Sequence, residues 1–120
     1  MDKTNPKYNL EERTAVFGED VILFLKLLPD NHIVRPLVNQ IIRSATSIGA
    51  NYMEANGASS RKDFRNKICI CKKESNETKH WLRMISMAVP DKSEDCRKLW
   101  QEAQELTMIF AKIIVSSSQF

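Results

Sequence analysis

The chain has 120 residues and a formal net charge of +3, and 42% of its residues are hydrophobic. This length supports one domain with a single core, and the small positive charge gives only weak support for an anionic partner. Three cysteines, Cys69, Cys71 and Cys96, without an apolar leader, predict free thiols in the cytoplasm rather than a secreted disulfide framework. No apolar run is long enough to cross a bilayer, so no membrane association is expected.

The first expected element is a helix over residues 10–28, which follows a loose arm at residues 1–9. Its core face carries Phe17, Val21, Phe24 and Leu28 at helical spacing. Further apolar residues lie on its other faces: Ile22, Leu23, Leu25 and Leu27. A helix of a monomeric bundle needs one apolar face, so this excess predicts a contact with a second copy of the chain. The alternative is a helix end covered by a loop.

Pro29 ends that helix, and a second helix is expected from about residues 33–35 to Asn56, because Pro36 is tolerated only in a first turn. Gly57 is expected just past its end in the left-handed conformation. Beside its apolar face runs a polar stripe at spacings of four and three. The stripe consists of Gln40, Ser44, Ser47, Asn51 and Glu54. Small hydroxyls and amides in this pattern predict a close helix contact with internal hydrogen bonds.

A third helix is expected after Ser60, which has capping-box spacing to Asp63. Its core row is Phe64, Ile68, Cys71, Ser75, Thr78, Leu82 and Ile85. The carboxylates Glu74 and Glu77 lie on one flank of this row. The other flank carries the cations Lys62, Arg65, Lys72, Lys79 and Arg83. Charge is therefore sorted around this helix.

The second and third helices are expected to be antiparallel about the turn at residues 56–60, which sets their register. This register places Arg43 opposite Glu74, with Glu77 one turn away. We predict a partly buried ion pair between Arg43 and one of these glutamates, completed by hydrogen bonds from Gln40 and Ser47. We interpret this polar seam as structural, fixing the register of the helices. The alternative is a pocket in which Arg43 binds an anionic ligand.

A fourth helix is expected after Pro90, with Asp91 and Glu94 at capping-box spacing and a frayed tail over residues 116–120. Its core residues are Cys96, Leu99, Trp100, Ala103, Leu106, Phe110, Ile113 and Ile114. No internal repeat or linker divides the chain. Residues 1–120 are therefore predicted to form one all-α domain, an antiparallel up-down-up-down four-helix bundle.

Catalytic and metal-binding patterns are weak in this sequence. Glu77-x-x-His80 matches one element of a di-iron bundle, but such a site needs a second element and further inward carboxylates. Cys69 and Cys71 would point about 200° apart on a helix and cannot chelate as a CxxC turn does. No Ser/His/Asp arrangement or phosphate-binding loop is present. We therefore expect no enzyme, no metal and no cofactor.

The basic flank of the third helix has two interpretations. It can follow a phosphate backbone of RNA or DNA, and it would do so without sequence preference because it lacks base-reading geometry. It can instead be a solvated face that provides solubility. No aromatic side chain interleaves with these cations, as a single-strand stacking platform requires. Two function classes remain: a nucleic-acid-binding protein, and a protein-interaction scaffold without nucleic-acid contact.

The stretch QIIRSATSIGANYMEANGASSRKDF, followed by KKESNETKHWL, resembles the bacterial four-helix-bundle proteins linked to 23S ribosomal RNA intervening sequences. The matching positions are Gln40, Arg43, Ser44, Ser47, Ile48, Asn51, Glu54, Asp63, Phe64 and Glu77. The resemblance extends from about Phe17 to Phe110. Many members have a Gly-Ser pair where this chain has Lys73-Glu74, so no function is carried over to that part of the third helix.

This resemblance implies a closed bundle that assembles as a ring, typically a homopentamer. Related proteins include the accessory subunit of diversity-generating retroelements, which is a basic ring that binds nucleic acid and a reverse transcriptase. The resemblance therefore implies three classes of partner for this chain: further copies of itself, RNA or DNA, and a reverse transcriptase.

Overall fold

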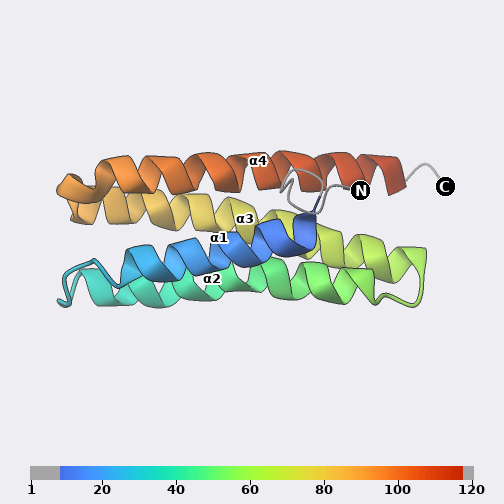
Figure 1. Ribbon diagram of the computed structural model, residues 1–120, viewed down its shortest axis with the longest axis horizontal. Coiled ribbons are helices and arrows are strands. Elements are labelled where there is room, and N and C mark those ends of the chain that lie inside the picture. The colour runs from blue at the N-terminus through green and yellow to red at the C-terminus, as the bar shows by residue number, and fades with distance from the viewer. Residues whose placement is uncertain (1–8, 118–120) are drawn as a thin grey trace.

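The computed structural model describes residues 9–117, which form α1 (Leu10–Leu25), α2 (Val34–Asn56), α3 (Arg61–Ala88) and α4 (Ser93–Ser117), with a short 3₁₀ helix, η1 (Pro90–Lys92), before α4. Consecutive helices run side by side in opposite directions (Figure 1). Both α1 and α3 pack against α2 and α4, so the four helices enclose one core. The predicted all-α, up-down-up-down four-helix bundle is confirmed. Residues 1–8 of the predicted arm lie outside the described residues.

The core is built from the apolar faces that the sequence predicts. Its largest fully buried side chains include Phe17, Val21, Ile41, Ile48, Ile68, Leu82, Ile85, Leu106 and Phe110. Six of the seven residues of the predicted α3 row are buried, and Phe64 is half-buried. The α1 and α2 backbones approach closely at Gly49, where an added Cβ would lie 3.4 Å from the hydroxyl of Thr14. None of the helices in the described chain is long and apolar enough to span a membrane.

Helix α1 ends at Leu25, one turn earlier than predicted. The amides of Leu27 and Leu28 donate to the carbonyls of Phe24 and Leu25, which tightens the chain into i→i+3 turns. Pro29 explains this early end, because a proline disfavours the α conformation of the residue before it. Leu25 is buried, so only Ile22, Leu23 and Leu27 of the predicted surplus apolar residues are exposed.

Two predicted helix boundaries use a different geometry. Gly57 follows α2 with φ −96° and ψ 10°, so it is not left-handed as predicted. The amides of Gly57 and Ala58 instead donate to the carbonyls of Glu54 and Ala55, which closes a tight turn. Asp91 lies inside η1, which leads directly into α4, so it does not occupy the predicted cap position. The Ser60 cap of α3 is confirmed, since its hydroxyl accepts from the Asp63 amide at 3.0 Å.

The end of α4 is longer than predicted. Ser116 and Ser117 belong to its last turn rather than to a frayed tail, and residues 118–120 lie outside the described chain. The Ser117 hydroxyl donates to the Ile114 carbonyl at 3.1 Å. Ile113 and Ile114 pack on the core immediately before this turn, which holds the helix end in place.

The three cysteines differ sharply in their surroundings, which leads to a prediction about thiol reactivity. Cys69 is exposed, whereas burial raises the pKa of the Cys71 thiol to about 12 and that of Cys96 to about 11. Because the thiolate is the reactive form, a raised pKa slows reaction at pH 8. We expect a disulfide reagent to titrate Cys69 rapidly in the folded protein, and the other two thiols only in denaturant.

Absorbance of the thiolate released from the reagent measures both the rapid reaction of Cys69 and the later reaction of Cys71 and Cys96 in denaturant. Cys69→Ser serves as the control and should remove the rapid phase entirely. Two rapid thiols in the folded wild-type protein would contradict the burial of Cys71 and Cys96.

Candidate nucleic-acid interface and polar seam

The predicted ion pair between α2 and α3 is present. Arg43 Nη1 lies 3.2 Å from Glu74 Oε2, and Nη2 donates to Glu77 Oε2. The indole N–H of Trp81 donates to the same Glu77 oxygen at 3.0 Å. The Glu74 side chain is 9% exposed and that of Arg43 is 50% exposed. The pair thus joins a buried carboxylate to an arginine that reaches it from the surface, so Arg43 is more exposed than predicted.

The rest of the predicted seam makes other contacts. Gln40 is exposed, and the Ser47 hydroxyl donates to the carbonyl of Ser44 within α2 at 2.9 Å. Asn51 donates to the Ser47 carbonyl at 2.9 Å, and Glu54 pairs with Lys67 of α3 at 2.7 Å. The prediction that Gln40 and Ser47 complete the Arg43 network is therefore wrong. Serine and asparagine side chains readily bond a carbonyl three or four residues earlier, which competes with bonds between helices.

Two pairs of hydroxyl groups cross the core between helices. The Thr78 hydroxyl of α3 donates to the Ser44 hydroxyl of α2 at 2.9 Å, and both residues are fully buried. Ser75 of α3 and Thr107 of α4 form a second pair, also at 2.9 Å. Each hydroxyl also bonds a carbonyl of its own helix. Ser44 is thus the one member of the predicted seam whose hydroxyl bonds across to another helix within the core.

A second ionic contact, which we did not predict, joins α1 to α4. Arg13 Nε and Nη2 each lie 2.7 Å from an oxygen of Glu102, and Nη2 lies 2.9 Å from Glu105. The Arg13 side chain is only 9% exposed, and its bond to Glu102 raises the pKa of its guanidinium above the usual range. The sequence gives one sign of this contact, an arginine within the apolar pattern of α1. Its partner lies 89 residues away, so it could not be identified without the fold.

The predicted basic flank of α3 lies along the boundary with α4, and its members differ in exposure. Lys62 and Arg83 are exposed, whereas Arg65 and Lys72 are half-buried. The Nε atom of Arg65 is buried without a hydrogen-bond partner among the described atoms. No carboxylate within residues 9–117 forms an ion pair with any of these four cations.

Lys79, the fifth cation, is held against α4. Its ammonium donates to the side-chain oxygen of Gln104 and lies 5.3 Å from the centroid of the Trp100 ring. Desolvation at this contact lowers the pKa of Lys79. This contact also shows that α4 places an aromatic ring beside the basic flank. The periodicity of one helix does not reveal the side chains of its neighbour, so this contact could not be predicted from α3 alone.

The α4 side of this boundary is largely apolar. Trp100, Met108 and Val115 are exposed there at helical spacing, with Gln104 between the first two. We call the surface made by Lys62, Arg65, Lys72, Lys79 and Arg83 of α3 together with this α4 stripe the α3–α4 face. It combines cations from one helix with apolar side chains from the other.

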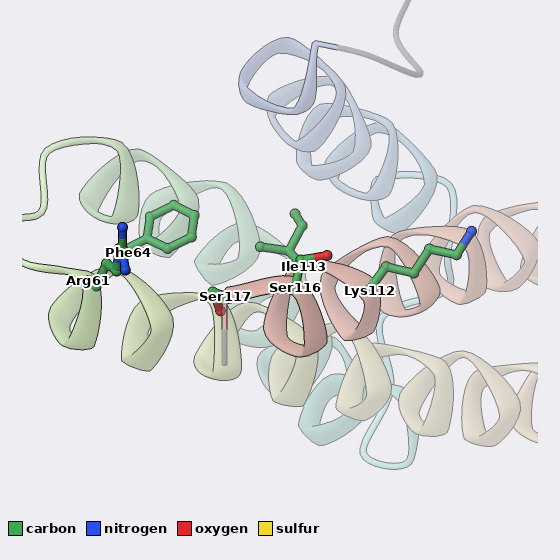
Figure 2. Close-up of a pocket in the computed structure, with 6 residues that line it drawn as sticks. All are labelled: Arg61, Phe64, Lys112, Ile113, Ser116 and Ser117. Carbon is green, nitrogen blue, oxygen red and sulfur yellow. The ribbon is translucent and has the colours of Figure 1, made fainter. Parts of the chain in front are cut away.

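A hollow of about 640 Å³ lies at one end of the α3–α4 face, where Arg83 and Met87 of α3 meet Arg97 and Trp100 of α4. A second hollow, of about 430 Å³, lies between the first turn of α3, with Arg61 and Phe64, and the last turns of α4 (Figure 2). It sits at the end of the bundle that α1 does not reach (Figure 1). Its lining includes Ser117, the last described residue, and we assign it no function.

The Glu77-x-x-His80 pattern does not form a metal centre here. Glu77 is engaged by Arg43 and Trp81, while His80 is exposed and its ring stacks edge-on against Trp81. In the part of the chain that the structure describes, no three His, Cys, Asp or Glu side chains are grouped to hold a metal ion.

The fold and this surface define an all-α bundle protein with a row of cations along one flank of α3. The chain belongs to the 23S rRNA-intervening sequence protein family, whose model matches residues 8–112. The predicted family resemblance is thereby confirmed, while the further link to retroelement accessory subunits stays a prediction.

A solved structure supports this assignment. It is a protein of unknown function from the S23 ribosomal protein family of Bacteroides thetaiotaomicron VPI-5482. It is 31% identical to this chain and superposes with a TM-score of 0.76, covering 87% of this chain and 96% of its own. No curated protein sequence is significantly similar to the chain. Both the family model and this solved structure therefore support the same family and the same helical fold.

The pair between Arg43 and Glu74 leads to a stability prediction. Arg43→Ala leaves the buried Glu74 carboxylate without its charged partner, while the exposure of the arginine limits the loss. We expect the free energy of unfolding, measured by urea denaturation, to fall by about 1–3 kcal/mol. Glu74→Gln in the same background should recover part of this loss, because it removes the stranded charge.

Arg35→Ala is the matched control, because Arg35 pairs with Asp30 and both side chains are largely exposed. Its effect should stay below about 1 kcal/mol. If Arg43→Ala and Arg35→Ala lowered the free energy of unfolding equally, the pair with the buried Glu74 would contribute no more than an exposed ion pair.

Proposed function

We propose that this protein is a non-enzymatic, oligomeric nucleic-acid-binding protein that contacts RNA or DNA through the α3–α4 face. The observation that carries the proposal is a set of four cations on this face, Lys62, Arg65, Lys72 and Arg83, that have no carboxylate partner within residues 9–117. Unpaired cations in a row attract phosphates and release counterions on binding.

The distribution of charge around α3 supports this proposal. On the α2 side, Arg43 forms ion pairs with Glu74 and Glu77, and Lys67 pairs with Glu54. That side of α3 is therefore close to neutral. On the α4 side the cations stay uncompensated. The uncompensated cations of α3 therefore lie on one flank of this helix instead of being spread evenly around it. A helix row contacts phosphates without reaching base edges, so binding should be independent of sequence.

Self-association is the second part of the proposal. Ile22 and Leu23 of α1, and Leu27 in the turn after it, are exposed although they are large and apolar. Leu23 and Leu27 also line a groove of about 270 Å³ beside α4, together with Leu99 and the charged residues Asp20, Asp95 and Lys98. Apolar surface of this kind marks a protein contact, and the family resemblance implies a ring, typically of five copies. A ring would repeat the α3–α4 face and raise its local positive charge.

A protein-interaction scaffold is the second candidate function. The exposed α4 residues Met108 and Val115 favour it, because apolar side chains on the same face suit a protein surface as well. The two candidates differ in salt dependence, since phosphate contacts weaken steeply with added salt and apolar contacts do not.

The nucleic-acid proposal predicts the effect of removing the cations. Arg65→Gln, Lys72→Gln and Arg83→Gln together should abolish binding to a mixed-sequence RNA or DNA duplex, or weaken it at least tenfold. Each lost phosphate contact should also reduce the slope of log affinity against log salt by about one. Fluorescence anisotropy at several salt concentrations measures both, and circular dichroism checks the fold.

The control variant is Lys26→Gln, Arg35→Gln and Lys112→Gln, which removes the same formal charge from exposed positions that belong neither to the α3–α4 face nor to the groove beside Leu23 and Leu27. It should retain most of the affinity and the salt slope. If both triple variants lose affinity equally, binding depends on the net charge of the protein and not on the position of the cations. If neither variant loses affinity, α3 is not the contact surface.

The oligomer proposal makes a separate prediction. Light scattering at micromolar concentration should give the mass of an oligomer, most simply a pentamer of the 13.8 kDa chain. Leu23→Asp with Leu27→Asp should shift it toward monomer, because charges would then be buried at the contact. Met53→Asp is the control, since Met53 is equally exposed on α2. A monomeric wild-type protein would refute this part of the proposal.

A further inference from the structure

The hollow at the α4 start of the α3–α4 face combines an aromatic ring with two cations. Trp100 lines it and is 39% exposed, and Arg83 and Arg97 line it from α3 and α4. Its remaining walls are mainly apolar or small, including Leu82, Met87 and Pro90. No carboxylate is among its lining residues in the described chain.

Three cations lie at or beside this hollow and could contact the phosphates of a bound strand. The Lys79 ammonium lies 5.3 Å from the Trp100 ring centroid. Arg83 follows Lys79 by one turn of α3 and has no ion-pair partner within residues 9–117. Arg97 pairs only with Glu94, one turn earlier in α4 and exposed. Two arginines thus share the hollow with Trp100, and Lys79 lies over one face of the indole ring.

An exposed aromatic ring beside several cations favours a particular form of nucleic acid. Bases of a duplex already stack on each other and cannot stack on a protein ring. An unpaired base can do so, and each such contact contributes about 1–3 kcal/mol whatever the base. The apolar walls exclude water from the base, while the flanking phosphates meet the cations. A duplex would gain only the phosphate contacts.

We infer that the hollow binds a single-stranded segment of RNA or DNA, with one unpaired base stacked on Trp100 and its neighbouring phosphates held by Lys79, Arg83 and Arg97. This inference rests on the proposed function, because the strand must first be held along the α3–α4 face. It goes further in naming the strandedness of the ligand and the residue that selects it.

The test compares Trp100→Leu with Trp100→Phe. Affinities for oligothymidylate, oligouridylate and a DNA duplex of equal length are measured by anisotropy at one fixed salt concentration. Trp100→Leu should weaken binding of both single strands about tenfold more than it weakens duplex binding, which corresponds to about 1.4 kcal/mol. Trp100→Phe should restore most of the loss, because phenylalanine retains a face for stacking.

Fluorescence gives a second, direct readout. Trp81→Phe leaves Trp100 as the only tryptophan of the chain, since the sequence has two. Single strands should quench its emission, and the duplex should not. Glu94→Gln should change the affinity in the opposite direction from Trp100→Leu. It releases Arg97 from its ion pair, so the affinity for the single strands should rise.

Several outcomes overturn the inference. Equal effects of Trp100→Leu on single strands and duplex, or binding of single strands without quenching, would exclude stacking while leaving the proposed function intact. Equal quenching by polyglutamate would show that the hollow selects negative charge, as an acidic protein partner would supply. Failure of the wild-type protein to bind any oligonucleotide at low salt would instead refute the proposed function itself.

Discussion

The bundle depends on the way in which α3 packs against two helices at once. Its row of buried residues contains the small hydroxyls Ser75 and Thr78, which pair with Thr107 of α4 and Ser44 of α2. Leucines at these positions would hold the helices further apart, whereas these small hydroxyl side chains are satisfied in the apolar core by carbonyls of their own helices. The additional bonds between the paired hydroxyls permit close packing and favour one register of the helices.

That packing decides which charges of α3 are neutralised. Once Ser44 faces Thr78, Arg43 falls beside Glu74 and Glu77, and Lys67 falls beside Glu54. Within residues 9–117, no acidic residue of α4 forms an ion pair with the basic flank on the other side of α3. The acidic residues in the middle of α4, Glu102 and Glu105, instead turn toward α1 and bind Arg13. These carboxylates therefore project from the α1 side of α4, whereas Trp100 and Gln104 face the basic flank of α3.

Much of this arrangement could be predicted from the sequence, because it follows from local periodicity. The core row of α3, the Ser60 cap and the pair between Arg43 and Glu74 all depend on spacing within one helix or across one short turn. The contact of Arg13 with Glu102 and that of Lys79 with Trp100 could not be predicted, because they depend on how distant helices meet. Gly57 shows a further limit, since a tight turn can leave a helix without any left-handed residue.

The proposed self-association surface at α1 and the proposed nucleic-acid surface at α3 belong to helices that do not contact each other. Helix α1 contacts α2 and α4 but not α3, so the two helices are diagonal in the described bundle. The exposed apolar residues of α1 therefore point away from the basic flank of α3. If copies associate through α1, the basic flanks stay outside the contact, and association adds their charges along one surface. Each phosphate contact contributes to the salt dependence of binding, so an assembly would bind a long strand far more tightly than one chain could. A scaffold that merely joined proteins would not need this separation of an apolar α1 surface from a charged α3 surface.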